Sequence, residues 1–476
     1  MSKPTNKKPK TKNISVATRS DTFTGRAARY IFYTMLAYAP VHTLFSVWLG
    51  TALDIFSFTR VVMELLLLIG FGLVLVASAK KPWLKQAFKD KLFWVIGAFI
   101  LLHLLLMAMQ PKNIEAELLG LAYNTRYLVF FIYAALLAHL CSRAHLLKRS
   151  LQVVLASAFI VLAFGVLQQA ILPANTMEKL GYSQDIGVLP IVLIGDNPEI
   201  SRVFSTQSNP DAYGSYLLII VTIAMVYLRF ARQHSSRYVL VGIIGLGFIN
   251  LLYTYSRSAW LGFVLGVIAL IVLLVKQGVH RKVKREVKLV LFSVLIASVV
   301  VAGGMLYALG SGTTIEGNII RNSEQMESIK GADEIRIENW QGSLDTVMAE
   351  PIGGGPSAAG PASLLTDTPN VNNNYYLQIA LETGILGLVA FLAVIVAVFI
   401  RLWCWSTKSP IAAALMASFV GLAITNMFAH IWTYEAVAYT WWGLAGLFIV
   451  LGTSNSKPGT RNMKLGNREK KVARSK

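Results

Sequence analysis

Long apolar runs recur along nearly the whole chain, and each is long enough to cross a hydrocarbon layer of about 30 Å as a helix. Inside such a layer every backbone N–H and C=O group needs an internal partner, so runs of this length favour helices. Hydrophobic residues make up 55% of the 476 residues, whereas charged residues make up only 14%. A soluble protein carries roughly 25% charged residues. We therefore predict an all-α, polytopic membrane protein.

The apolar runs predict about twelve transmembrane helices. They lie at residues 28–49, 61–79, 92–110, 126–141, 151–172, 212–228, 238–255, 258–275, 289–309, 384–403, 410–428 and 436–452. Two long loops, at about 173–211 and 310–383, fall on the same side, and the second is expected to contain short amphipathic helices. We divide the chain into a membrane domain at 27–453 and disordered basic cytoplasmic tails at 1–26 and 454–476.

The charge pattern predicts the orientation of the chain. Most of the 44 Lys and Arg residues fall in the two tails and in the short loops on the same side as the tails. Few acidic residues accompany them: Asp21, Asp90, Glu286 and Glu469. The positive-inside rule then places both termini in the cytoplasm and the two long loops outside. The formal net charge of +20 reflects membrane topology and contact with anionic lipid, not nucleic acid.

Three arginines on the predicted outer face are candidates for binding an anion. Arg202 lies in "SRVFSTQSNPDAYGSYL", Arg257 in "TYSRSAWLG" and Arg336 in "RIENWQGSLDTVMAEPIGGGP". A guanidinium offers a rigid fork of donors that fits phosphate oxygens two at a time, so three converging arginines would suit a diphosphate. The structural alternative is that Arg257 anchors a hairpin at the lipid headgroups and that Arg336 pairs with an acid of its own helix.

The outer loop 310–383 contains one clear helical pattern. Apolar residues at Ile337, Trp340, Leu344 and Val347 form one stripe, which predicts a short amphipathic helix over 336–350 that Pro351 stops. The following "GGGPSAAGP" lacks the GK[ST] of a phosphate-binding loop. We expect it to form a flexible, tightly turning lid or linker.

The stretch "NNYYLQIALETGILG" stands where this loop meets the next predicted span. Its asparagines suit a helix N-cap, its tyrosines suit the interfacial aromatic belt, and Gly384 permits a break before the span. This structural reading accounts for each residue type separately. It does not account for their occurrence together with Glu382 and Gly387.

The same stretch resembles the signature of the O-antigen ligase and O-antigen polymerase superfamily. The matching positions are Asn374, Tyr376, Leu377, Leu381, Glu382, Gly384 and Gly387, and the three arginine segments resemble the other motifs of that family. The resemblance implies a GT-C-like, metal-independent glycosyltransferase without a cofactor. It would transfer a glycan from an undecaprenyl-diphosphate-linked donor to a glycan or glycolipid acceptor at the outer face of the bacterial cytoplasmic (inner) membrane, as a polymerase or a ligase.

The resemblance also implies roles for individual residues. Arg202, Arg257 and Arg336 would hold the donor diphosphate. The catalytic candidates are Glu338, Glu382, Asn373 and Asn374, with Asp345 as a further carboxylate that could take a proton. The candidates for positioning the acceptor are Tyr376, Trp340 and His430. Asn373 stands where the family has a histidine, and an amide is neither acid nor base near neutral pH, so it could only orient a hydroxyl.

Two other function classes fit parts of the sequence. A transporter or flippase of lipid-linked glycans would show polar residues at mid-membrane, but the predicted spans hold few ionisable groups, with His42 and His103 the most interior. A peptidoglycan-polymerase-like glycosyltransferase would depend on an aspartate of an outer loop in place of the arginine set. The arginine set therefore distinguishes the leading hypothesis from both.

Overall fold

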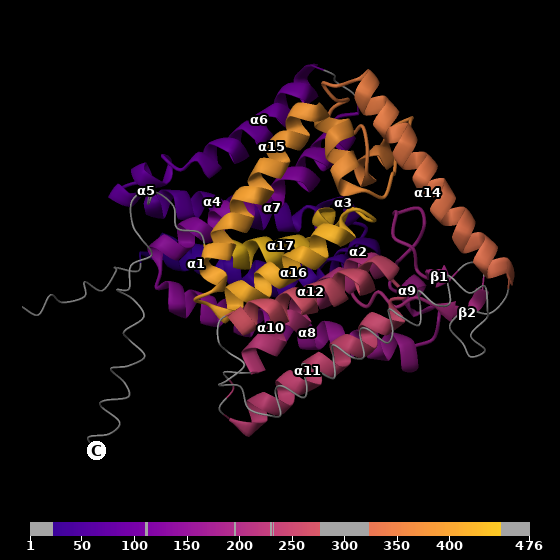
Figure 1. The fold of residues 1–476 in the computed structure, drawn as a ribbon, viewed down its shortest axis with the longest axis horizontal. Helices are drawn as coiled ribbons and strands as arrows, with labels where there is room; N and C mark the ends of the chain where they lie inside the picture. The colour runs from indigo at the N-terminus through magenta and orange to yellow at the C-terminus, as the bar shows by residue number, and fades with distance from the viewer. Residues whose placement is uncertain are drawn as a thin grey trace, which may run out of the picture.

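The computed structural model describes residues 22–109, 113–194, 197–228, 231, 233–276 and 323–448. These residues fold mainly into α-helices (Figure 1), with one small antiparallel hairpin of β1 (Leu193–Ile194) and β2 (Asn197–Ser201). Seven helices of this part are long and apolar enough to cross a membrane. They are α6 (Lys91–Met109), α7 (Ile114–Leu140), α8 (Arg143–Ala170), α10 (Pro210–Leu228), α11 (His234–Tyr253), α12 (Arg257–Lys276) and α15 (Tyr375–Ser406).

The remaining described helices are shorter or, in the case of α14, less apolar. The apolar ones are α1 (Phe23–Tyr38), α2 (His42–Ala52), α4 (Val62–Ser78), α16 (Pro410–Thr425) and α17 (Glu435–Gly446). The others are α3 (Phe56–Arg60), α5 (Pro82–Ala87), α9 (Thr176–Lys179), α14 (Ser323–Ala349) and the 3₁₀ turns η1 (Ala39–Val41), η3 (Pro361–Leu365) and η4 (Ile431–Thr433). The prediction of a polytopic helical membrane protein is confirmed.

Every predicted span except 289–309 overlaps at least one described helix. The span 289–309 lies outside the described residues, as do nearly all of the tail 1–26, the tail 454–476 and the part of the outer loop before Ser323. The figure of about twelve transmembrane helices therefore stays a prediction.

Two predicted spans have different limits in the structure. The span 28–49 is interrupted at η1, because Pro40 has no N–H to continue the helix and its ring disfavours an α-helical turn before it. The span 126–141 belongs to a longer helix that begins at Ile114, with Asn113 as its N-cap. Charged residues in the first half of α7 hide this helix from an apolar-run search, yet two of them are almost fully buried.

The centre of the bundle is formed by α10 and α17, whose side chains are nearly all buried. Beside them α12 and α16 pack with close backbone contact, because a Cβ atom on Gly262 would lie 2.8 Å from the carbonyl oxygen of Gly421. Such contacts between small residues are typical of helices that associate in lipid. By contrast, α6 and α15 expose many large apolar side chains, as expected for helices that face acyl chains.

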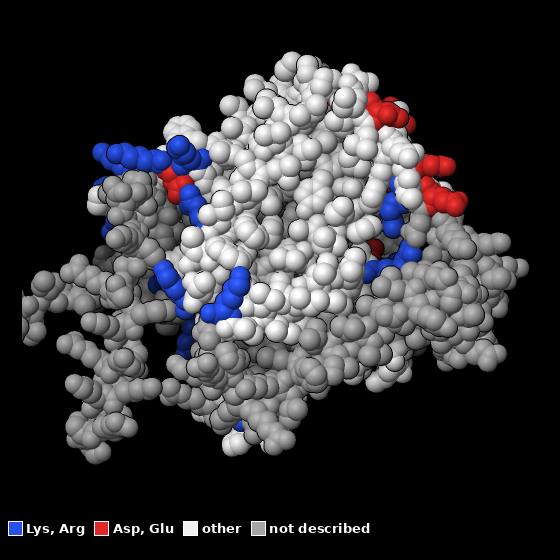
Figure 2. Space-filling view, viewed as in Figure 1, with Lys and Arg blue, Asp and Glu red and all other residues white. Residues whose placement is uncertain are grey.

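The two ends of the molecule differ in charge. Figure 2 shows Lys and Arg side chains gathered at the α5 end, whereas Asp and Glu side chains gather along α14 at the opposite end. The helix α14 crosses this second end of the bundle (Figure 1). It packs on α15 through one row that contains the buried Val347, while Ile337 and Leu344 are 53% and 52% exposed. The predicted helix over 336–350 is confirmed as part of the longer α14, but Val347 is the one buried residue of its apolar stripe.

The glycine-rich segment after α14 is docked onto the bundle, so the prediction of a flexible lid is wrong. The N–H of Gly354 donates to the carbonyl of Leu381 over 2.8 Å, and that of Gly355 donates to the carbonyl of Glu382 over 3.0 Å. Both carbonyls are released from α15 by a kink, because α15 leaves helical geometry in this turn. The small residues let the backbone of 353–355 approach α15 closely enough to replace the lost helical bonds.

We predict that Gly384→Ala destabilises the fold by about 2 kcal/mol or more. Gly384 forms the kink with φ +67°, and a Cβ atom there would collide with the carbonyl oxygen of Pro351. The midpoint of thermal unfolding of the detergent-purified variant measures this effect. Gly97→Ala is the matched control, since Gly97 lies in α6 with open space around it. Equal midpoints for the two variants would contradict the prediction.

Candidate functional site

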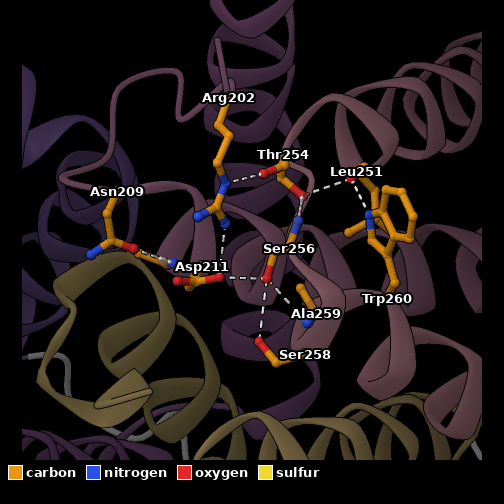
Figure 3. A network of polar contacts seen from close by, with 10 residues as sticks. Arg202, Asn209, Asp211, Leu251, Thr254, Ser256, Ser258, Ala259 and Trp260 are labelled. Carbon is orange, nitrogen blue, oxygen red and sulfur yellow. Dashed lines mark hydrogen bonds and ion pairs between the residues drawn. The ribbon is translucent and has the colours of Figure 1, made fainter. Parts of the chain in front are cut away.

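The side chain of Arg202 is fixed by two contacts directly after β2. Its Nε donates to the carbonyl of Thr254 over 2.9 Å, and its Nη2 donates to Oδ1 of Asp211 over 3.1 Å (Figure 3). The Arg202 side chain remains 20% exposed and that of Asp211 35% exposed. The ion pair is therefore anchored on the protein side and still accessible from solution.

The carboxylate of Asp211 also contacts the segment that carries Arg257, and so brings it close to Arg202. Ser256 donates its hydroxyl to Oδ1 of Asp211 over 2.6 Å, and its Oγ accepts the N–H of Ala259 in the first turn of α12 (Figure 3). Arg257, the first residue of α12, directly follows Ser256. The segments that carry Arg202 and Arg257 therefore meet at Asp211, whereas the convergence of the two arginine side chains stays a prediction.

Strained backbone accompanies these segments. Ser205, Tyr255 and Asn373 have φ angles of +53°, +48° and +50°, a region that costs non-glycine residues free energy. Ser205 follows the Arg202 segment, Tyr255 precedes Arg257, and Asn373 is the residue at the family histidine position. Strain of this kind is enriched at functional sites, where the surrounding fold compensates for it.

The third arginine lies on the packed face of α14. Arg336 is partly buried, one turn before Trp340. The indole N–H of Trp340 donates to the carbonyl of Asn372 over 3.0 Å, and its ring lies 5.8 Å from that of Phe428. Glu338 is exposed, and residues two apart on a helix point in different directions. Glu338 therefore does not share the face of Arg336 and Trp340.

The loop from Asn426 to Tyr434, between α16 and α17, joins the arginine segments. Phe428 contacts Trp340 on α14, and η4 packs against α10, the helix that carries Asp211. Figure 2 shows basic side chains around a hollow beside α14, with an acidic group recessed inside it. We call residues 426–434 the hub loop, because they touch two helices. These are α10, which carries Asp211, and α14, which carries Arg336.

His430 lies in the hub loop and is only 2% exposed. Its carbonyl accepts from the N–H and the hydroxyl of Thr433 at 3.0 and 2.6 Å. Within the described part of the chain, neither ring nitrogen has a hydrogen-bond partner. Burial lowers the pKa of His430 from 6.5 to about 4, so the imidazole is neutral near pH 7.

The asparagine and tyrosine residues before the kink of α15 have structural contacts. Asn374 caps α15, since its side-chain oxygen accepts the N–H groups of Tyr376 and Leu377 at 3.0 and 3.2 Å. The hydroxyl of Tyr376 donates to the carbonyl of Ala423 over 3.1 Å. The Asn373 side chain, by contrast, is exposed. Of these three predicted site residues, Asn373 has the most exposed side chain, Tyr376 is partly buried and Asn374 is buried.

Glu382 lies inside the bundle and is 0% exposed. Its carboxylate accepts from Asn124 of α7, and from the amide of Gln378 at 3.3 and 3.4 Å. The Tyr375 hydroxyl donates to the other end of the Asn124 side chain over 3.2 Å. This network joins α15 to α7, which explains why a carboxylate stands next to the kink of α15.

One charged site was not predicted from the sequence. Arg126 of α7 is 4% exposed and contacts Glu64 at 2.5 Å and Glu435 at 2.7 Å. It also donates to the carbonyl of Thr433 in the hub loop. The sequence signal was an arginine at the edge of an apolar run, where a charge is costly unless it is paired. In the described residues, no group of three or more His, Cys, Asp or Glu side chains is placed to hold a metal ion.

We predict that His430 makes the fold less stable in mild acid. The unfolded chain binds a proton at His430 near pH 6.5, but the folded chain only near pH 4, so stability falls as the pH drops between these values. By pH 5 the loss is about 2 kcal/mol. The thermal unfolding midpoint at pH 7 and pH 5 should therefore change less in His430→Gln than in wild type. The exposed His145 provides the control His145→Gln, and an unaltered shift in His430→Gln would refute the assignment.

Comparison with known proteins supports one family. Residues 242–392 match the family model described as O-antigen ligase. The matched part contains Arg257, Arg336 and the stretch that begins at Asn373, whereas Arg202 and His430 lie outside it. The comparison with curated proteins gives no match. The family-model match over residues 242–392 supports the resemblance of this chain to the O-antigen ligase and O-antigen polymerase superfamily.

Proposed function

We propose that the protein transfers a glycan from an undecaprenyl-diphosphate-linked donor to a glycan or glycolipid acceptor, as a polymerase or ligase of surface polysaccharide. The observation that carries this proposal is the hub loop, which contacts α14, the helix that bears Arg336, and packs against α10, whose first turn holds the Asp211 partner of Arg202. The family match over residues 242–392 supports glycan transfer at a membrane.

The proposal places the site at the outer face of the bacterial cytoplasmic membrane. Apolar spans and the family match support an inner-membrane protein. The basic end of the molecule would face the cytoplasm with both termini, and the α14 end would face outward (Figure 2). Residues 27–453 would form one membrane glycosyltransferase unit between cytoplasmic tails at 1–26 and 454–476.

Arg202, Arg257 and Arg336 would bind the donor diphosphate. Two of the five N–H donors of the Arg202 guanidinium are used by Thr254 and Asp211. These contacts orient the guanidinium before the ligand arrives, which lowers the entropy cost of binding. The positive charges would also stabilise the negative charge that grows on the diphosphate as it leaves, a contribution of electrostatic preorganisation that needs no metal in this proposal.

The reaction itself joins an acceptor hydroxyl oxygen to the anomeric carbon of the donor, while the bond from that carbon to the diphosphate oxygen breaks. The hydroxyl proton needs an acceptor. We propose His430 for this role, because it lies in the hub loop and neither of its ring nitrogens has a hydrogen-bond partner among the described residues. The exposed Asn373 would orient the hydroxyl, and Trp340 would position the acceptor beside Arg336.

The remaining catalytic candidates receive other roles in the proposal. Glu382 would hold α15 against α7, since both of its oxygens accept hydrogen bonds inside the bundle. Asn374 and Tyr376 would shape the start of α15. The carboxylates of Glu338 and Asp345 are exposed on α14, where they would contact the acceptor glycan and not the diphosphate.

We predict that Arg202→Ala lowers the affinity for undecaprenyl diphosphate by roughly tenfold to a hundredfold, because a charge-assisted phosphate contact is lost. Arg202→Lys should recover part of this loss, since it keeps the charge without the fork. The probe is undecaprenyl diphosphate added to the purified protein in lipid nanodiscs, with undecaprenol as the uncharged comparison.

Arg60→Ala serves as the control, since Arg60 lies at a surface pair with Glu115 at 3.8 Å. Wild-type protein that binds the diphosphate no better than undecaprenol would overturn the proposed function.

In cells that depend on the protein, the glycan profile distinguishes a polymerase from a ligase. Loss of long chains with single repeats retained indicates a polymerase, and accumulated carrier-linked polymer indicates a ligase.

A further inference from the structure

An apolar groove lies between α4 and α6 at the basic end of the bundle. Both helices pack against α7, which forms the floor of the groove, and α5, which joins them in the chain, also lines it (Figure 1). The groove has a volume of about 210 Å³, and all of its lining residues are apolar. Its walls include Phe71 and Leu75 of α4 and Ile100 of α6, and its floor includes Ile132 and Leu136 of α7.

The groove opens on a side of the bundle that suits acyl chains. Gly97 of α6 lines it and is exposed, and a Cβ atom there would meet no neighbouring side chain within 4 Å. Further along α6, the side chains of Leu101 and Leu105 are 54% and 50% exposed. A hollow with apolar walls does not hold ordered water, so in a bilayer it is filled by hydrocarbon.

The α5 end of the groove has the features of a membrane–water interface. Trp83 of α5 stacks on His139 in the last turn of α7, with ring centres 4.9 Å apart. The indole N–H of Trp94 donates to the carbonyl of Phe88 over 2.8 Å. Tryptophans with an apolar body and a bonded N–H gather at the level of the lipid headgroups. We therefore place the α5 end of the groove at that level, with the rest of the groove beside the acyl chains.

The same end carries a surplus of positive charge. The segment 80–91 contains five lysines and one acid, Asp90, and Figure 2 shows basic side chains gathered at this end. Asp90 is paired with Arg401, whose Nη1 donates to Oδ2 over 2.8 Å, so it does not neutralise the lysines. Lys85 and Lys89 are exposed, and each directly follows a residue that lines the groove. An anionic headgroup would complement this charge, whereas a neutral one would not.

The size of the groove restricts its occupant. One turn of an α-helix with a diameter of about 10 Å and a pitch of about 5.4 Å occupies roughly 420 Å³. This is twice the volume of the groove, about 210 Å³, so a helix of a partner protein cannot insert. A single acyl chain is thinner and flexible, and part of its length can enter.

We propose that this groove binds an anionic phospholipid, with one acyl chain between α4 and α6 and the headgroup phosphate beside Lys85 and Lys89. The apolar walls account for the acyl chain, and the lysines account for the negative headgroup. The site lies at the end of the bundle opposite α14 (Figure 1), and its helices lie outside the segment that matches the family model. The inference is therefore independent of the proposed function.

Native mass spectrometry of the full-length protein purified in detergent tests the site. The probes are phosphatidylglycerol and phosphatidylcholine with identical acyl chains. The wild type should bind phosphatidylglycerol roughly tenfold more tightly or better, because each nearby lysine favours an anionic lipid by about fivefold. Equal affinities of the wild type for the two lipids would overturn the proposal.

Gly97→Trp tests the groove itself. The indole would fill the hollow, so the affinity for phosphatidylglycerol should fall by roughly tenfold or more. Gly242→Trp is the matched control, since Gly242 of α11 is also exposed with open space around it but does not line the groove. Wild-type affinity in Gly97→Trp, or equal losses in both variants, would contradict the site. If Gly97→Trp does not accumulate in membranes, Gly97→Leu replaces it.

The combined change Lys85→Gln and Lys89→Gln tests the headgroup contact. It should remove most of the preference for phosphatidylglycerol and leave the affinity for phosphatidylcholine unchanged. The control pair is Lys148→Gln with Arg149→Gln, two exposed cations near the start of α8. A loss of the same size in the control pair would show a general attraction to the basic surface and would refute the site. Tighter, lysine-dependent binding of undecaprenyl phosphate would refute the choice of occupant.

Discussion

A buried guanidinium constrains everything around it, because it cannot move without leaving two carboxylates unpaired in an apolar interior. In this protein the guanidinium of Arg126 joins α4, α7, α17 and the hub loop. The apolar helices around it can slide and repack at low cost, since lipid and protein interiors are similar solvents for them. The polar contacts are what fix the loops at the α14 end of the bundle in one arrangement.

The kink of α15 also leaves buried polar groups that need partners, but here they are backbone carbonyls and not charged side chains. A helix that breaks inside an apolar bundle exposes carbonyls that need donors. The glycine-rich segment supplies them from Gly354 and Gly355, which donate to the carbonyls of Leu381 and Glu382. The composition of the glycine-rich segment is typical of a hinge, but these hydrogen bonds make the segment part of the scaffold. The segment therefore ties the end of α14 to α15.

The sequence predicted what depends on local pattern and missed what depends on distant contacts. Apolar length located the spans, and helical spacing located α14 over 336–350. The break at Pro40 follows from the missing N–H of proline, but the apolar run on both sides of Pro40 predicts one continuous span. The role of the loop 426–434 was not readable, because its contacts join residues as far apart as Arg126 and Thr433, 307 positions along the chain. The three arginines were named from their residue type, while the network that orients Arg202 needed coordinates.

The left-handed backbone of Asn373 has an evolutionary consequence. Asparagine, aspartate and histidine tolerate this conformation better than most residues, since their short polar side chains can bond locally. The position can therefore exchange an amide for an imidazole without any rearrangement of the main chain, and the codons of the two residues differ by a single base. Relatives that share this turn can gain or lose a titratable group there in one step, so the fold leaves the chemistry of the position free to diverge.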